Sequence, residues 1–108
     1  METDYKWGEV IELASQVEPA EGRVQFKRVF ENGNGGVSLL AFKKGQVLDT
    51  HLAPAEVMVN VLEGEIEFTL NNEKNTLRKG DFLLMGADVP HSVVANTDAK
   101  VMLVKIKA

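Results

Sequence analysis

Two histidines are the side chains of this sequence best suited to bind a metal ion or to move a proton. His51 lies in GQVLDTHLAPAEV, just before an Ala-Pro-Ala corner, and His91 lies in GADVPHSVV, directly after Pro90. A neutral imidazole is the most common metal ligand in proteins, and it titrates near neutral pH. The chain has no cysteine, which excludes thiolate metal sites, disulfides and a cysteine nucleophile. Any metal would therefore be held by nitrogen and oxygen ligands.

A strong metal site would need a third ligand beside the two imidazoles, because the common open iron site adds a carboxylate to two histidines. Glu56 is the first candidate, but alternate residues of a strand share a face, so Glu56 points away from His51 unless a β-bulge near Pro54 shifts the parity. Asp49 has the parity of His51 and is a second candidate. We expect at most a weak site for a divalent transition metal such as Fe, Zn, Ni or Mn. In that site His51 and His91 bind the metal, and Glu56 or water completes the ligand set.

Short apolar segments separated by turn residues predict an all-β fold. The stretch Asn-Gly-Asn-Gly-Gly at 32–36 is a strong hairpin signal, and residues 65–70 alternate between apolar and polar side chains. The predicted strands are residues 24–30, 37–42, 47–51, 57–62, 65–70, 76–78, 82–85, 92–95 and 101–106. Many short strands at close, regular spacing indicate a sandwich or a barrel.

The single helix signal lies at the N-terminus. Residues 8–17, GEVIELASQV, carry apolar side chains at helical spacing, and Pro19 and Gly22 follow as stop signals. We therefore expect two parts in the chain. Residues 1–22 form a helical segment that packs on the barrel or on a partner subunit, and residues 23–108 form the barrel domain.

The sequence around the two histidines resembles the two motifs of the cupin superfamily. The first motif is a Gly, five residues, His-x-His, three or four residues, Glu, six residues and Gly, and here Gly45, His51 and Gly64 are in register. The second motif is a Gly, five residues, Pro-x-Gly, two residues, His, three residues and Asn, and here Gly80 and His91 fit. The resemblance covers most of the chain. It implies a cupin-type double-stranded β-helix, which is a jelly-roll barrel.

The metal-binding positions of that family are only half retained. In typical cupins two histidines and one glutamate of the first motif, with one histidine of the second, bind the ion. Carried over position by position, the second histidine is Ala53 and the glutamate is Val57, with Glu56 displaced by one residue. Only His51 and His91 remain. The sequence resembles the small, single-domain conserved-barrel cupins of bacteria, with a degenerate metal motif.

Three functions are compatible with this resemblance. The first is the binding of a small molecule in the barrel cavity, with His51 and His91 as polar anchors. The residues expected to line that pocket are His51, Val59, Val61, Phe68, Met85 and His91. The second is a metal-dependent oxygenase or isomerase that uses His51 and His91, with Glu56 or water completing the site. The third is a barrel that serves only in oligomer assembly.

Composition and charge exclude other classes of function. The net charge is −4 and no basic run exceeds two residues, which argues against binding to nucleic acid. No apolar run approaches membrane-spanning length and the N-terminus lacks the apolar region of a signal peptide, so we expect a cytoplasmic protein. The stretches 57–62 and 101–106 are apolar on both faces, which favours a homodimer.

Overall fold

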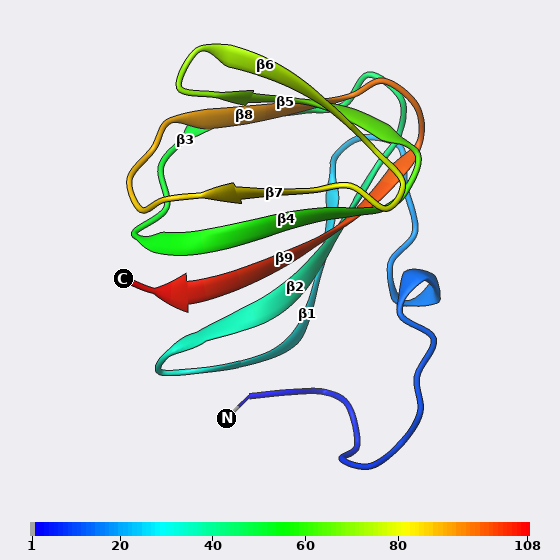
Figure 1. The fold of residues 1–108 in the computed structure, drawn as a ribbon. Coiled ribbons are helices and arrows are strands. Elements are labelled where there is room, and N and C mark those ends of the chain that lie inside the picture. Colours follow the sequence, from blue (N-terminus) through cyan, green and yellow to red (C-terminus); the bar gives the residue numbers. More distant parts are fainter. Residues whose placement is uncertain (1) are drawn as a thin grey trace.

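The computed structural model describes residues 2–108, and within them the chain forms two antiparallel sheets that pack face to face (Figure 1). The larger sheet has the strand order β1-β2-β9-β4-β7, and the smaller sheet has the order β3-β8-β5-β6. The strands are β1 (Gln25–Asn32), β2 (Gly35–Phe42), β3 (Val47–His51), β4 (Ala55–Glu63), β5 (Glu65–Leu70), β6 (Glu73–Arg78), β7 (Phe82–Met85), β8 (His91–Ala95) and β9 (Ala99–Lys107).

The predicted all-β jelly-roll barrel is confirmed. Neighbouring strands come from distant parts of the chain: β9 lies between β2 and β4, and β8 lies between β3 and β5. Three strands, β3, β5 and β7, have the predicted bounds, whereas most of the others continue into polar residues. The pair β5 and β6 shows why, because Asn71 and Asn72 adopt φ angles of 48° and 70°. Positive φ at both central residues is what a tight two-residue hairpin requires, so pairing begins directly at Leu70 and Glu73.

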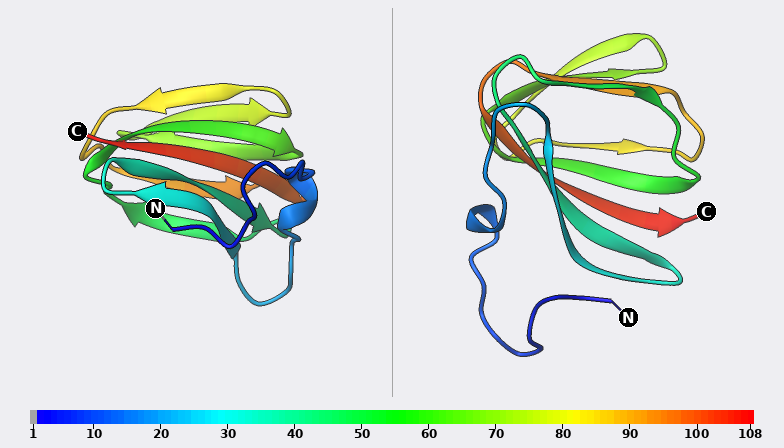
Figure 2. Two further views of the ribbon diagram at one scale, coloured as in Figure 1. Left: turned by 90° about the horizontal axis from the view of Figure 1, so that it is seen from below. Right: turned by 180° about the vertical axis from the view of Figure 1, so that it is seen from behind.

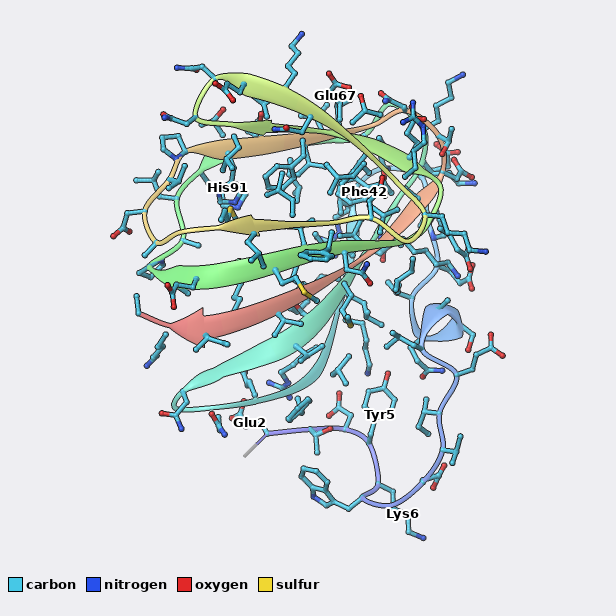
Figure 3. All side chains as sticks on the ribbon, in the orientation of Figure 1. Glu2, Tyr5, Lys6, Phe42, Glu67 and His91 are labelled. Carbon is cyan, nitrogen blue, oxygen red and sulfur yellow. The ribbon has the colours of Figure 1, made fainter. Side chains whose placement is uncertain are left out.

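The hydrophobic core fills the space between the two sheets. Alternate residues of β4, Val57, Val59 and Val61, are at most 3% exposed, and they face Ile66 and Phe68 of the smaller sheet within one core cluster. Burying one such side chain contributes roughly 1.5–3 kcal/mol. Phe42, which is fully buried, lies between the sheets at the end away from the C-terminus (Figure 3). The core is therefore closed at that end.

The helix expected over residues 8–17 is not formed, and a single 3-10 turn at Ala14–Gln16 takes its place. Gly8 adopts a φ of 81° and Val17 is extended, so the helical backbone is interrupted on both sides. A helix this short is marginal unless its apolar side chains pack against the rest of the protein. Val10 is 98% exposed, so the barrel does not cover all the apolar side chains of this stretch. No helix within residues 2–108 has the length and apolarity to cross a membrane.

The N-terminal segment instead runs along the outside of the larger sheet (Figure 2). Val17 is buried with Leu39 and Ala41 of β2 in a second, smaller core. Lys100 of β9, which is 7% exposed, donates to the carbonyl oxygen of Ala14 at 2.6 Å and to Glu18 at 3.0 Å. The segment is thus held by an apolar contact and by one buried charge.

We predict that Lys100→Ala loosens this segment. The replacement removes a buried ammonium group that satisfies a backbone carbonyl, and such hydrogen bonds to charged groups contribute about 1.5–3 kcal/mol. Urea unfolding should show a loss of this size, and hydrogen exchange should rise first near Ala14. The exposed Lys79→Ala is the matched control. Equal stability of the two variants would contradict the anchoring role.

Candidate functional site

His51 and His91 form a direct cross-strand pair at one end of the barrel. His51 is the last residue of β3, His91 is the first residue of β8, and the two are partners in the antiparallel ladder. Residues opposite one another in such a ladder point to the same face. Their ring centroids are 4.0 Å apart and the ring planes make an angle of 60°. Figure 3 shows His91 between the two sheets, toward the end where the C-terminus lies.

Each imidazole is oriented by a backbone carbonyl two residues earlier in the chain. Nδ1 of His51 lies 2.9 Å from the carbonyl oxygen of Asp49, and Nδ1 of His91 lies 3.0 Å from that of Val89. A carbonyl oxygen only accepts hydrogen bonds, so both Nδ1 atoms carry a proton and donate it. In the neutral rings Nε2 is then the unprotonated nitrogen, which can accept a hydrogen bond or bind a cation. Asp49 contributes its carbonyl here, and its side chain is exposed.

His91 is the buried member of the pair. It is 5% exposed, and its ring stacks on Phe68 with centroids 5.7 Å apart and planes 9° from parallel. Burial is the main cause that lowers the pKa of His91 below its ordinary value of 6.5, although the hydrogen bond to the Val89 carbonyl raises it. The positive charges of His51 and Lys105 lower this pKa further. His91 is therefore mainly neutral at pH 7, whereas His51 is exposed.

The histidines lie at an apolar cavity of about 160 Å³ between the sheets. Three of the residues expected to line it, Val59, Phe68 and Met85, do so. Val61 is fully buried in the core and is not part of the cavity wall. Other apolar wall residues are Leu40, Phe42, Leu48, Val57, Ile66 and Leu103. The cavity therefore presents an apolar interior with two imidazoles among its few polar groups.

Lys105 is the one ionisable residue of the cavity wall that the sequence patterns did not single out. It pairs with Val57 of β4 in the larger sheet, and the parity of β9 places it on the inner face with Val101 and Leu103. The parity itself was readable from the sequence. The stretch VMLVKI, however, is apolar on both sides of Lys105, so the sequence alone does not say which face is inside.

The residues of the site do not provide the ligand set of a tightly bound metal ion. Glu56 is exposed and alternates with the buried Ala55 and Val57, so no bulge turns it toward the histidines. Within residues 2–108, no three His, Cys, Asp or Glu side chains are placed to hold one ion together. Lys105 adds a positive charge to the same cavity, which opposes a cation. Two imidazoles with free Nε2 atoms are present, but a third protein ligand is not provided by these residues.

Comparison with known proteins identifies the family of this chain. A family model described as a cupin domain matches residues 38–107, which include β2 to β9 almost completely and both histidines. This chain belongs to the cupin family. The proposed correspondence of His51 and His91 to the two cupin motifs thus lies within the matched region. No curated protein of known function matches the sequence.

Several solved structures share the fold of this cupin. A conserved protein of unknown function from Streptococcus pyogenes is 24% identical, with a TM-score of 0.89 over 100% of this chain and 96% of its own. An RmlC-like cupin from Desulfovibrio desulfuricans is 30% identical, with a TM-score of 0.81 over 91% of this chain and 95% of its own. A cupin 2 conserved barrel domain protein from Leptotrichia buccalis is 31% identical, with a TM-score of 0.85, and the match covers 90% of this chain and 47% of that one.

We predict that the neutral, buried state of His91 makes stability depend on pH. Its pKa is lowered in the folded state, so the unfolded chain binds more protons near pH 6.5. Its contribution is then fully present above pH 6.5 and is lost as the pH falls through 6.5 toward the lower folded value, by at most about 1.4 kcal/mol per pH unit. Urea unfolding between pH 7.5 and 5.5 should show this slope for the parent. His91→Phe, which preserves a ring against Phe68, should flatten it, and an unchanged slope in that variant would contradict the assignment.

Proposed function

We propose that this cupin binds a small molecule inside its barrel, with His51 and His91 as the polar anchors. The observation that carries the proposal is the combination of an apolar cavity with two imidazoles whose Nδ1–H groups are already bonded to backbone carbonyls. Their Nε2 atoms have fixed directions and are left for a ligand. Apolar pockets with a few convergent polar groups are the usual form of ligand sites.

The size of the cavity limits the ligand. An apolar cavity of about 150 Å³ in another protein binds benzene, whereas drug-sized ligands occupy pockets of about 300–1,000 Å³. A cavity of about 160 Å³ therefore accepts one ring or a short branched chain. Each CH₂ group that enters it contributes about 0.8 kcal/mol. The rest of the ligand would remain near the histidines at the mouth.

The two imidazoles suit a ligand with a hydroxyl, amino or acid group beside its apolar part. A neutral ring with its proton on Nδ1 accepts a hydrogen bond at Nε2, and a protonated ring donates one there. Because His91 is stacked on Phe68 and bonded to Val89, its ring needs little further ordering when a ligand binds. Such preorganisation lowers the entropic cost of binding.

We predict that one-ring compounds with a polar substituent stabilise the protein, and that EDTA leaves this effect intact. Benzyl alcohol, benzamide and benzoate are suitable probes, with thermal unfolding as the measurement. A ligand at 100 times its Kd adds about 2.7 kcal/mol of stability. The variants His51→Ala and His91→Phe should reduce the shift for all probes, and Lys79→Ala should retain it. Stabilisation that disappears with EDTA and returns with a metal would contradict the metal-independent site.

We also propose that a second copy of the chain covers the exposed part of the larger sheet. Phe82 and Leu84 of β7 and Ile106 of β9 are 62%, 66% and 58% exposed on its outer face. Met58 of β4 pairs with Leu84 on one side and Val104 on the other, so these apolar side chains form one continuous surface. Contiguous exposed apolar surfaces of this kind are typical of protein interfaces.

A charge placed on this surface should separate the copies. We predict that Leu84→Asp converts a dimer into a monomer, because an unpaired carboxylate would be buried at the contact. Sedimentation at several protein concentrations measures the change. Thr76→Asp, on the exposed side of the smaller sheet, is the matched control and should remain dimeric. A parent protein that sediments as a monomer at all concentrations would contradict the interface.

A further inference from the structure

We propose that the ligand of the barrel is a small carboxylate, and that Lys105 is the residue that selects for its charge. The inference rests on the small-molecule function proposed above and adds the chemical class of the ligand. The carboxylate would lie at the mouth beside the lysine, and an imidazole that takes up a proton there would donate its Nε2–H to the carboxylate. Its apolar body, about the size of one ring, would fill the cavity.

The ionisable side chains of the cavity wall are all basic. Within residues 2–108, its ionisable side chains are His51, His91 and Lys105, and no aspartate or glutamate lines it. This contrasts with the whole chain, which has 16 acidic and 12 basic residues and a net charge of −4. The absence of carboxylates from the wall is thus not a result of composition. The lysine charge, with no carboxylate beside it in this wall, attracts an anion and repels a cation.

Lys105 is placed to meet an anion without a competing partner. Its ammonium group forms no ion pair within 4 Å in the described chain, whereas Lys100 on the same strand is paired with Glu18. Its charge already acts on the site, since it contributes to the lowered pKa of His91. A carboxylate bound nearby would relieve this repulsion. The unpaired charge of Lys105 therefore favours the binding of a carboxylate.

The residue paired with Lys105 in β2 has no side chain. This residue is Gly36, where an added Cβ would lie 2.6 Å from the Cβ of Glu31 and 2.8 Å from the carbonyl oxygen of Phe30. The place of a side chain at Gly36 is thus already occupied by Glu31 and the backbone of Phe30. A second groove also reaches Lys105 and shares Ala53 and Pro54 with the cavity. Lys105 thus lines both the cavity and the groove, and the one carboxylate of the groove, Glu31, is paired with Arg28.

The apolar wall makes the charge pair selective. Lys105 is exposed, but a hydrogen bond between an ammonium group and a carboxylate is still shorter and stronger than one between neutral groups. An alcohol of the same shape would fill the cavity equally well but would lose this interaction. An inorganic anion would keep the charge but lose the apolar contact. The structure thus favours a molecule that has both parts.

The experiment compares matched acids and alcohols on the full chain at pH 7.5 with EDTA present. The probes are benzoate against benzyl alcohol, and cyclohexanecarboxylate against cyclohexylmethanol, with inorganic phosphate as the anion without an apolar body. Isothermal titration calorimetry gives the Kd. We expect each acid to bind about 10- to 100-fold more tightly than its alcohol, which is the usual effect of a hydrogen bond to a charged group. Phosphate alone should bind more weakly than either acid.

Two lysine variants test the assigned residue. Lys105→Met should remove the preference for acids and leave the alcohols within about twofold of the parent, because only the charge contact is lost. Lys107→Met removes the same charge from the same strand at a residue outside the cavity wall and should retain the preference. Lys105→Arg should restore much of it. Circular dichroism and unfolding confirm that each variant is folded.

The results separate this inference from the proposed function. If acids and alcohols bind the parent equally, the carboxylate assignment is overturned while small-molecule binding stands. If Lys105→Met and Lys107→Met weaken the acids alike, a general surface field, and not Lys105, selects the charge. If no probe binds or stabilises the parent at millimolar concentration, the proposed function fails together with this inference.

Discussion

The antiparallel pairing of His51 with His91 is the contact on which the rest of the site depends. It brings together two side chains 40 positions apart in the chain, and it exists because β8 lies between β3 and β5 in the smaller sheet. β8 is in turn fixed through its pairing with β5, whose Ile66 and Phe68 are buried in the core. The position of His91 is therefore set by the packing of the whole barrel, and that of His51 by β8.

The two ends of the barrel differ in the side chains that lie there. Phe42 and the small side chain of Ala99 are paired and fully buried at one end, so that end is filled. At the other end the cavity wall contains two imidazoles, a lysine and the corner at Ala53 and Pro54. The positions where typical cupins have metal ligands are occupied here by Ala53 and Val57, whose small apolar side chains line the cavity. These two side chains thus extend the apolar wall of the cavity.

Much of the fold was readable from the sequence because its signals are local. The alternation of residues 65–70 and the Asn-Gly turn at 32–36 determine strands and hairpins without reference to the rest of the chain. The prediction of an N-terminal helix was wrong because helical periodicity records the spacing of apolar residues but not whether a surface is available to cover them. There, Leu13 and Val17 contact the sheet while Val10 faces solvent. The backbone follows the sheet and forms only one turn.

The candidate site was readable only in part. The motif spacing indicated the two histidines, and the parity argument placed Glu56 on the outer face, as the structure does. Lys105 was hidden because β9 is apolar on both sides, the inner face packing in the core and the outer face lying under the N-terminal segment or exposed. Val61 was expected at the cavity, but it is buried in the core and does not line the cavity, although its ladder partner Val101 does. Which face of β9 points inward, and which inner side chains reach the cavity, depend on how the two sheets pack, and no strand pattern encodes this.

The position of β3 has a consequence for the lifetime of a complex. It is one of the two edge strands of the smaller sheet, four of its five residues are exposed, and its pairing with β8 is irregular between Leu48 and His51. Segments with few buried contacts open more readily than the core. In the proposed complex one anchor, His51, is thus on an edge strand and the other, His91, is on a strand that is paired on both sides. Dissociation would then follow the rate at which β3 detaches, so a ligand can be held tightly and still be exchanged quickly.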